Sequence, residues 1–337
     1  MNEQKNIIII GGGAGGLYAA WRLSQEGYKI TIIERQNFLG GLGTSIKKNN
    51  CFMDIGPHYI SLNKNSRIFE DVFHLLGKDS VYELPSLENF FKSFHQNKIL
   101  DNTPKLSSVM KDDKTSLFKK LIQNIFSKNN FDKLSSEEYL ISLYGESVYN
   151  SLCKPVLMQT YGEIPPLEII KKLYEPISIK KIIKYFKKNQ NQSEGKNSDF
   201  KPSTFNCYFK NGMGSIIDSL EKQIRQSDGK IILGANIESI EHNKSKLVRY
   251  TKDDQMFTES SDIILYSIPL SLVIKWFDNH TININQELTP SQISNGILVY
   301  LLVDTPKIFD GWLLDIYDLS IPFFRIAQQT FLSSNVA

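Results

Sequence analysis

Residues 7–16 read Ile-Ile-Ile-Ile-Gly-Gly-Gly-Ala-Gly-Gly, an apolar run that passes directly into a glycine cluster. The isoleucines predict a buried strand of a parallel sheet. In the spacing Gly11-x-Gly13-x-x-Gly16, the first glycine permits a tight turn and the second lets the backbone approach a pyrophosphate. The third lets the following helix pack against the strand. That helix, Leu17–Gln25, would direct its N-terminal amides at the phosphates.

A carboxylate follows the second predicted strand. Lys29–Ile33 ends at Glu34, roughly twenty residues after the glycine loop, where an acidic side chain accepts hydrogen bonds from ribose hydroxyls. A carboxylate at this place suits an unphosphorylated ribose. The alternative is a glycine-rich turn in an ordinary α/β unit. Because strand, loop, helix, strand and acid occur in this order, the sequence predicts an α/β, Rossmann-like fold that binds an adenine dinucleotide.

The length and composition are those of an ordinary globular protein. The 337 residues predict about two domains, and the net charge of +3 predicts no nucleic-acid partner. The three cysteines, Cys51, Cys153 and Cys207, are isolated in sequence, which favours a reducing compartment over a disulfide framework. The N-terminal apolar run is too short for a signal peptide, and no other stretch predicts a membrane span. We therefore expect a cytoplasmic location.

A second glycine cluster follows Glu34-Arg35. It reads Phe-Leu-Gly-Gly-Leu-Gly-Thr-Ser over residues 38–45, and a hairpin-like stretch after it ends in Asp-Ile-Gly-Pro-His over residues 54–58. A plain nicotinamide dehydrogenase of this fold would pass from the acidic residue into another β-α-β unit. Here the chain has further glycines instead, which are typical of places where the backbone lies close to a ligand.

Together these segments resemble the FAD-binding opening of the flavin amine oxidase superfamily, in the style of protoporphyrinogen-oxidase-like proteins, phytoene-desaturase-like proteins and UDP-galactopyranose mutases. The resemblance implies FAD as the cofactor and a Rossmann-like FAD-binding domain with an inserted α+β substrate domain. It also implies that the second glycine cluster passes beside the ribityl-pyrophosphate and the isoalloxazine, and that backbone near Ile237 contacts the adenine. The predicted cofactor-binding residues are Gly11, Gly13, Ala14, Gly15, Gly16, Glu34, Arg35, Gly40, Gly41, Leu42, Gly43, Thr44, Gly56, Pro57, His58 and Ile237.

The resemblance makes both domains discontinuous. The FAD-binding domain is predicted at 1–75 and 205–275, and the substrate domain at 76–204 and 276–337, with residues 189–201 as an exposed polar loop. The middle of the chain, from about 80 to 204, is predicted to be helical. The expected helices are Arg67–Leu76, Ser116–Phe126, Ser136–Cys153, Leu167–Lys188 and Ile216–Gln226. The expected strands are Lys230–Leu233, Ile237–Glu241, a hairpin around Asp253-Asp254, and three substrate-domain strands at 296–303, 312–317 and 323–329.

Two side chains are weak catalytic candidates. His58 follows Gly56-Pro57 in a segment that the resemblance places against the flavin, where it would orient the flavin or the substrate; alternatively, it hydrogen-bonds its own turn. Arg325 is an isolated charge in an apolar strand, so it either meets an anionic substrate group or forms a surface salt bridge. The five histidines lack metal-ligand spacing, and no metal site is predicted.

A basic segment begins at Lys171. Eight lysines and two glutamates lie between Lys171 and Lys196. Apolar side chains at 179, 182, 183 and 186 predict an amphipathic helix within Lys171–Lys188. Such a helix could rest on anionic lipid as a peripheral membrane contact. The alternative is a helix packed on the core with its lysines in solvent.

The main functional hypothesis is an FAD-dependent oxidoreductase that transfers a hydride from an amine or a C–C bond of a small organic substrate to the flavin. A second hypothesis is a flavin-dependent isomerase similar to UDP-galactopyranose mutase. In the superfamily a further glycine-rich segment returns to the cofactor, and we expect this sequence, which ends at Ala337, to lack it. The third hypothesis is therefore a truncated, catalytically impaired FAD-fold protein.

Overall fold

The computed structural model describes residues 4–48, 51–84, 90–95, 97–101, 131–173, 204–242, 245–276, 296–305 and 307–333. The chain divides into two compact units, described separately below. The first contains 1–85, 203–306 and 329–337, and the second contains 86–202 and 307–328. The predicted domain boundaries differ from these units, because described residues at 76–84, 296–305 and 329–333 lie in the first unit.

A four-stranded parallel sheet forms the centre of the first unit. Its strand order is β10-β2-β1-β14, from Lys230–Ile232, Lys29–Ile33, Asn6–Ile10 and Ile263–Tyr266. The isoleucines of β1 are at most 2% exposed, as expected for a central strand covered on both faces. The sequence placed β2 at the bounds observed, and the predicted Rossmann-like α/β fold is confirmed.

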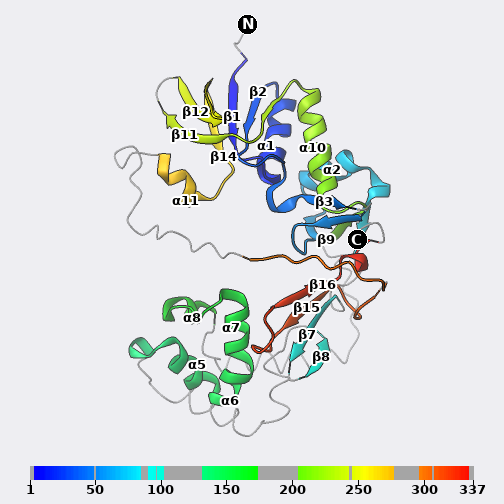
Figure 1. The fold of residues 1–337 in the computed structure, drawn as a ribbon, viewed down its shortest axis with the longest axis vertical. Coiled ribbons are helices and arrows are strands. Elements are labelled where there is room, and N and C mark those ends of the chain that lie inside the picture. Colours follow the sequence, from blue (N-terminus) through cyan, green and yellow to red (C-terminus); the bar gives the residue numbers. More distant parts are fainter. Residues whose placement is uncertain are drawn as a thin grey trace. The chain divides into compact units, whose positions relative to one another are not determined.

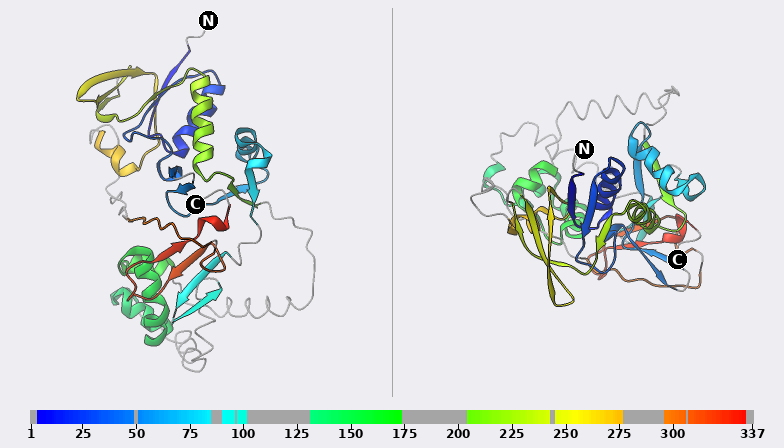
Figure 2. Two further views of the ribbon diagram at one scale, coloured as in Figure 1. Left: turned by 45° about the vertical axis from the view of Figure 1, so that its right-hand side comes forward. Right: turned by 90° about the horizontal axis from the view of Figure 1, so that it is seen from above.

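Helices α1 (Ala14–Gln25) and α10 (Gly214–Gln226) contact each other beside this sheet, and α10 also contacts α2 (Arg67–Leu76), as Figures 1 and 2 show. Helix α1 begins three residues earlier than predicted, because the glycine turn itself supplies the first helical turn. The amide of Leu17 donates to the carbonyl of Gly13 at 3.0 Å. The sequence placed α2 at the bounds observed.

Smaller sheets complete the first unit. A hairpin pairs β3 (Ser45–Lys48) with β4 (Cys51–Asp54), as the sequence predicted. A second sheet has the order β5-β9-β6, from Ile60–Asn63, Thr204–Phe209 and Val81–Glu83. A third has the order β11-β12-β13, from Asn236–Glu241, Lys246–Lys252 and Gln255–Ser261, with the predicted turn at Asp253-Asp254. The short helical elements described in this unit are η1 (Gly41–Gly43), η2 (Lys78–Ser80), α11 (Leu270–Val273), η7 (Ile274–Trp276) and η8 (Gln329–Phe331).

The second unit combines a four-stranded sheet with short helices. The sheet has the order β16-β15-β7-β8, from Arg325–Ala327, Leu313–Ile316, Phe91–His95 and Lys98–Asp101. Around Tyr139 and Tyr149, the helices bury a core of aromatic and aliphatic side chains. The helical elements are η4 (Phe131–Lys133), α5 (Ser136–Tyr144), α6 (Glu146–Val148), the π-helix η5 (Tyr149–Cys153), α7 (Lys154–Tyr161) and α8 (Leu167–Leu173).

Three predictions for these regions need correction. Strands β6, β7 and β8 lie in a stretch predicted to be helical, because pairing with β9 and β15 overrides the local pattern. The predicted helix Ser136–Cys153 is interrupted at Gly145, whose φ of 88° ends α5. The predicted helix Ser116–Phe126, the part of Leu167–Lys188 beyond 173, and the loop 189–201 lie outside the described residues.

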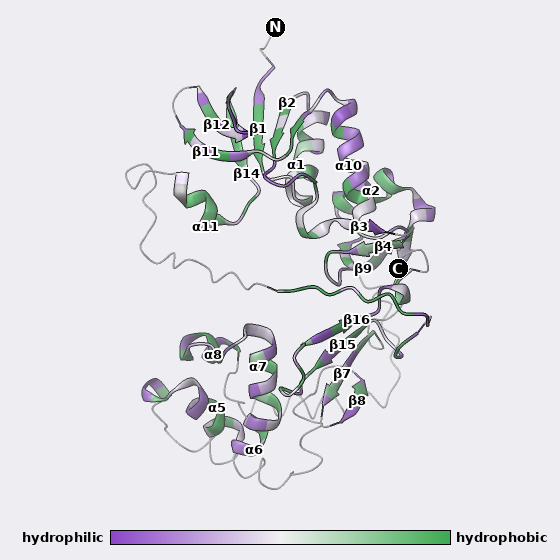
Figure 3. Ribbon diagram, viewed as in Figure 1, coloured by the Kyte–Doolittle hydropathy of each residue, from purple (hydrophilic) through white to green (hydrophobic). Residues whose placement is uncertain are grey.

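The segment 296–303 was predicted to be a strand and forms none in the structure. It has strong β-propensity, but a strand needs a hydrogen-bonding neighbour, and no ladder to this segment forms within the described ranges. Its apolar side chains are exposed: Ile297 is 90% exposed and Leu301 78%. Figure 3 shows the segment as a continuous hydrophobic stretch.

Candidate functional site

The loop between β1 and α1 is held by close backbone packing. Gly11 has a φ of +101°, and a β-carbon there would lie 2.7 Å from the carbonyl oxygen of Ser267. A β-carbon on Gly16 would lie 2.2 Å from the carbonyl oxygen of Gly11. Both distances are too short for any other residue, so the turn and the approach of α1 to β1 require glycine at these positions.

Gly13 differs from its neighbours, because nothing lies within 4 Å of the place where its β-carbon would stand. Its φ of −69° is open to any residue, so neither packing nor backbone conformation requires glycine here. Gly13 caps the N-terminus of α1, where no side chain accepts a hydrogen bond from the first-turn amides. Open space beside these amides suits an anionic group such as a pyrophosphate.

The carboxylate of Glu34 lies against this loop. Its Oε2 accepts a hydrogen bond from the amide of Gly12 at 2.6 Å, and its Oε1 accepts one from the amide of Gln36 at 2.7 Å. These bonds fix the side chain at the carboxyl ends of β1 and β2. Since an ionised carboxylate has about four acceptor positions, it can still accept hydrogen bonds from ribose hydroxyls.

The second glycine cluster packs on the first. The amide of Gly40 donates to the carbonyl of Gly12 at 2.7 Å, and Gly13 and Gly40 form an isolated parallel bridge. A β-carbon on Gly43 would lie 3.5 Å from that of Ala14. The structure therefore brings both predicted glycine segments together at the N-terminus of α1.

His58 lies just beyond a tight turn. Gly56 has a φ of +97°, and a β-carbon there would meet Cε1 of His58 at 3.1 Å. The amide of Ile55 donates to the carbonyl of Thr44 at 3.1 Å, which joins this turn to the second glycine cluster. The Nδ1 atom of His58 is buried and has no hydrogen-bond partner within the described residues. The predicted hydrogen bond from His58 to its own turn is therefore not made at Nδ1.

The other predicted cofactor residues are arranged as follows. Ile237 packs on the core cluster that contains Ile8 and Ile33, and the nearby Ala235 amide donates to the Glu34 carbonyl at 3.0 Å. Arg35 is exposed, and the side chain of Leu42 is 74% exposed. Gly15 lies in the first glycine loop, and Pro57 lies in the turn between Gly56 and His58. Their roles toward a cofactor stay predictions.

Arg325 is an ion-paired surface residue of the second unit. On β16, its Nε donates to Oδ1 of Asp315 on β15 at 2.6 Å, across the strand pair. This contact matches the salt-bridge alternative and gives no support to an anion site. From the predicted basic segment, the structure describes only Lys171–Leu173, where Lys171 pairs with Asp132 at 2.6 Å.

One buried side chain of this region was not predicted to have a role. Asp54, 1% exposed, is the last residue of β4, and its carboxylate accepts a hydrogen bond from the N-cap amide of α10. The sequence offers a single signal for it, an acidic residue that directly follows the apolar residues of a short strand. Its hydrogen-bonding partners come from distant parts of the chain, so sequence reasoning did not find them.

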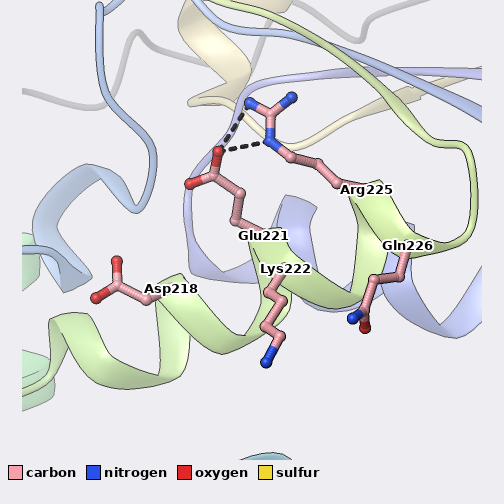
Figure 4. A pocket seen from close by; sticks show the side chains of 5 residues that line it. All are labelled: Asp218, Glu221, Lys222, Arg225 and Gln226. Carbon is pink, nitrogen blue, oxygen red and sulfur yellow. Dashed lines mark hydrogen bonds and ion pairs between the residues drawn. The ribbon is translucent and has the colours of Figure 1, made fainter.

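Two surface hollows lie apart from the glycine loops. A hollow of about 460 Å³ on one face of α10 is lined by Asp218, Glu221, Lys222, Arg225 and Gln226, with Arg225 paired to Glu221 (Figure 4). Another, of about 360 Å³, lies between α1 and α2 beside Trp21 and His74. No predicted cofactor residue lines either hollow.

The described residues contain few features of other kinds of site. No group of three or more His, Cys, Asp or Glu side chains there could hold a metal ion. Among the described helices, none has both the length and the apolar character needed to cross a membrane. Burial raises the pKa of Cys153 and of Cys207 to about 12, which keeps both thiols protonated at neutral pH.

Comparisons with known proteins agree with this geometry. The family model "NAD(P)-binding Rossmann-like domain" matches residues 9–76. Phytoene desaturase of Phycomyces blakesleeanus is 43% identical over 94 residues, which are 27% of this chain and 16% of the relative. The 4,4'-diaponeurosporene oxygenase of Staphylococcus aureus is 22% identical over 319 residues, 88% of this chain and 63% of the relative.

Among solved structures, reduced UDP-galactopyranose mutase aligns with 99% of this chain and 72% of its own, at 17% identity and a TM-score of 0.67. The chain spans less than two thirds of the length of the curated relatives named above. The similarity to the mutase structure concerns the fold. The match at residues 9–76 includes the end of the first strand, the glycine loop, the second strand and the carboxylate from which the sequence predicted a dinucleotide site.

Proposed function

We infer that this chain, whose fold and N-terminal dinucleotide-binding domain are those of the flavin amine oxidase-like superfamily, is an FAD-dependent oxidoreductase. One observation carries the proposal. The space at Gly13 is open, Gly13 caps the N-terminus of α1, and the amide of the preceding Gly12 donates to the carboxylate of Glu34. An adenine dinucleotide needs these two features side by side, one for its pyrophosphate and one for its ribose.

The residues of the site fit FAD as follows. The amides of α1 would hold the pyrophosphate, and Glu34 would accept hydrogen bonds from the ribose of the adenosine half. The segments 40–44 and 56–58 would pass beside the ribityl chain and the isoalloxazine. The buried, unpartnered Nδ1 of His58 supports a polar ligand at that end.

When bound, FAD supplies the group that accepts a hydride from the substrate. The protein's part would be to hold the cofactor, orient the substrate and keep water away. The two curated relatives are named for a desaturation of phytoene and an oxygenation of 4,4'-diaponeurosporene. We therefore propose an apolar organic substrate that is oxidised at a C–C bond, with an amine as the alternative.

The test is an absorbance spectrum of the purified full chain, followed by an anaerobic substrate screen. We expect a flavin spectrum, either as purified or after reconstitution with FAD, and bleaching of the flavin band by a polyene such as phytoene but not by a simple amine. Protein that binds no FAD would contradict the proposed function. Bleaching by the amine alone would overturn the substrate class and leave the oxidoreductase assignment intact.

A second candidate is a flavin-dependent isomerase. It is supported by the fold shared with UDP-galactopyranose mutase and by the buried, unpartnered Nδ1 of His58, which follows Gly56-Pro57. Here the flavin would be required in its reduced form, and no electron acceptor would be consumed. Turnover of a UDP-sugar by the chemically reduced protein, without consumption of an acceptor, would favour this candidate over the oxidoreductase.

A further inference from the structure

Asp54 is a buried carboxylate with three hydrogen-bond donors around it. Its Oδ1 accepts from the hydroxyl of Ser45 at 2.6 Å and from the amide of Met213 at 2.9 Å. Its Oδ2 accepts from the hydroxyl of Tyr208 at 2.5 Å. With 1% exposure, the carboxylate obtains its stabilisation from these donors rather than from water.

The donors come from three different elements. Ser45 begins β3, Tyr208 belongs to β9, and Met213 caps the N-terminus of α10. The hydroxyl of Ser45 also accepts a hydrogen bond from the amide of Gly214 at 2.7 Å. A negative charge at the N-terminus of a helix is favourable. Asp54 therefore joins the hairpin to the helix through one charged group.

The backbone at α10 is shaped to allow this contact. A β-carbon on Gly212 would lie 2.6 Å from Oδ1 of Asp54, and one on Gly214 would lie 2.8 Å from the amide nitrogen of Ser45. Only glycine permits both approaches. The glycines of this turn are explained by the carboxylate and the serine that they accommodate.

The peptide groups of Asp54 bind further segments. Its carbonyl accepts from the hydroxyl of Tyr300 at 2.6 Å and from Nε2 of Gln329 at 3.3 Å. Its amide donates to Oε1 of Gln329 at 3.2 Å. Tyr300 and Gln329 belong to the late parts of the chain that lie in the first unit. Five separate segments of the chain thus meet at this residue.

Asp54 also lies between the two segments that would hold the flavin end of the cofactor. Ser45, its partner, directly follows the predicted site residue Thr44, and the turn with Gly56 and His58 begins one residue after Asp54. The amide of Gly56 donates to the carbonyl of Asp54 at 2.8 Å. Movement of Asp54 would therefore displace both segments together.

We propose that Asp54 is a positioning residue for the flavin end of the site, which holds segments 40–44 and 56–58 in their cofactor-binding arrangement by anchoring them to the N-terminus of α10. The inference rests on the proposed function, because the segments are assigned to FAD. Asp54 acts through Ser45 and the Gly56 turn, and it need not touch the cofactor.

The test compares Asp54→Ala with Asp71→Ala. Asp71 is the matched control, because it is also buried, accepts a hydrogen bond from a tyrosine hydroxyl (Tyr18, 2.7 Å) and belongs to the same unit. Neither Asp71 nor Tyr18 is a predicted cofactor residue. FAD affinity is measured by flavin fluorescence. Visible circular dichroism reports the environment of the bound flavin, and thermal unfolding measures the stability of the FAD-free protein.

Both variants are expected to lower the stability of the FAD-free protein. Asp54→Ala should weaken FAD binding by at least about tenfold, because three donors lose their acceptor and the two segments are released. It should also change the visible circular dichroism of the flavin that remains bound. Asp71→Ala should leave affinity within about twofold of wild type. Equal affinity in both variants would overturn the inference.

Two further variants test the same role of Asp54 if Asp54→Ala does not fold. Asp54→Asn keeps an acceptor for Met213 and Ser45 and should restore most of the affinity. Ser45→Ala removes the serine hydroxyl that joins Asp54 to the second glycine segment, and it should weaken FAD binding by about threefold. Full affinity in Ser45→Ala, or no recovery in a folded Asp54→Asn, contradicts the inference. Wild-type protein that binds no FAD would instead overturn the proposed function, and this inference with it.

Discussion

The two glycine segments of the first unit are held in place by different means. The first loop, at 11–16, depends on close backbone packing: at Gly11 and Gly16 a β-carbon would collide with carbonyl oxygens. The second segment, at 40–44, depends on polar contacts that converge on Asp54 through Ser45. Close packing sets the first loop, whereas the second segment combines the Gly40–Gly12 hydrogen bond and the packing of Gly40 against Ile217 with the buried charge of Asp54. We therefore expect mainly the second segment to respond to the loss of that charge.

This difference explains what the sequence could predict. The order strand, loop, helix, strand and acid is local, and it predicted β1, α1, β2 and the position of Glu34. The hydrogen bonds of Asp54 that involve a side chain join residues separated by 9 to 275 positions. No periodicity or motif reports such contacts, because they depend on how distant elements pack. Local sequence therefore predicted the β1–α1–β2 unit better than the contacts that hold the second glycine segment.

The largest expected effect is that of Gly16→Ala, which tests the packing of the first loop. Its new β-carbon would stand 2.2 Å from the carbonyl oxygen of Gly11, so α1 must move away from β1. We expect a loss of about 3 kcal/mol in the free energy of unfolding. Chemical denaturation followed by circular dichroism measures it. Wild-type stability in this variant would show that the loop is not set by packing.

A smaller effect is expected for Tyr208→Phe, which tests the polar support of the second segment. Burial and the neighbouring Asp54 carboxylate raise the pKa of Tyr208, so its hydroxyl stays protonated and donates to Asp54. Loss of one hydrogen bond to a charged group should cost about 2 kcal/mol in the free energy of unfolding. The first loop should be unaffected, which amide hydrogen exchange at α1 would check. Faster exchange at α1 would mean that the two segments are not independent.

Much of the remaining fold depended on pairing that the local sequence does not encode. Strands β7 and β8 lie in a stretch predicted to be helical, and they form because β7 pairs with β15, more than 200 residues further along the chain. Conversely, the segment 296–303 has the composition of a strand and lacks a ladder partner within the described residues. In both cases the presence of a neighbouring strand determines whether the segment forms a strand, and β-propensity or helix propensity alone predicts the wrong secondary structure.

The smallest expected effect is on the pH dependence of stability. His242 lies within hydrogen-bonding distance of the Tyr266 hydroxyl at the end of β14, and burial, with a contribution from Lys246, lowers its pKa from 6.5. The folded state thus binds this proton less readily than the unfolded state, and stability should fall as the pH drops below 6.5. Urea unfolding at pH 7.5 and 5.5 measures the fall. It should be smaller in His242→Gln, and an equal fall in both proteins would exclude His242 as a source.

The most direct test of the central claim, that the first loop is built around a dinucleotide, is FAD titration of Gly13→Ala. Nothing lies within 4 Å of the new methyl group, and φ is −69°, so the variant should fold, with a loss of about 1 kcal/mol at most because alanine is a poorer N-cap than glycine. The methyl group would occupy the space assigned to the pyrophosphate, and FAD affinity should fall by at least about tenfold. Unchanged affinity in a fully folded Gly13→Ala protein would contradict the account.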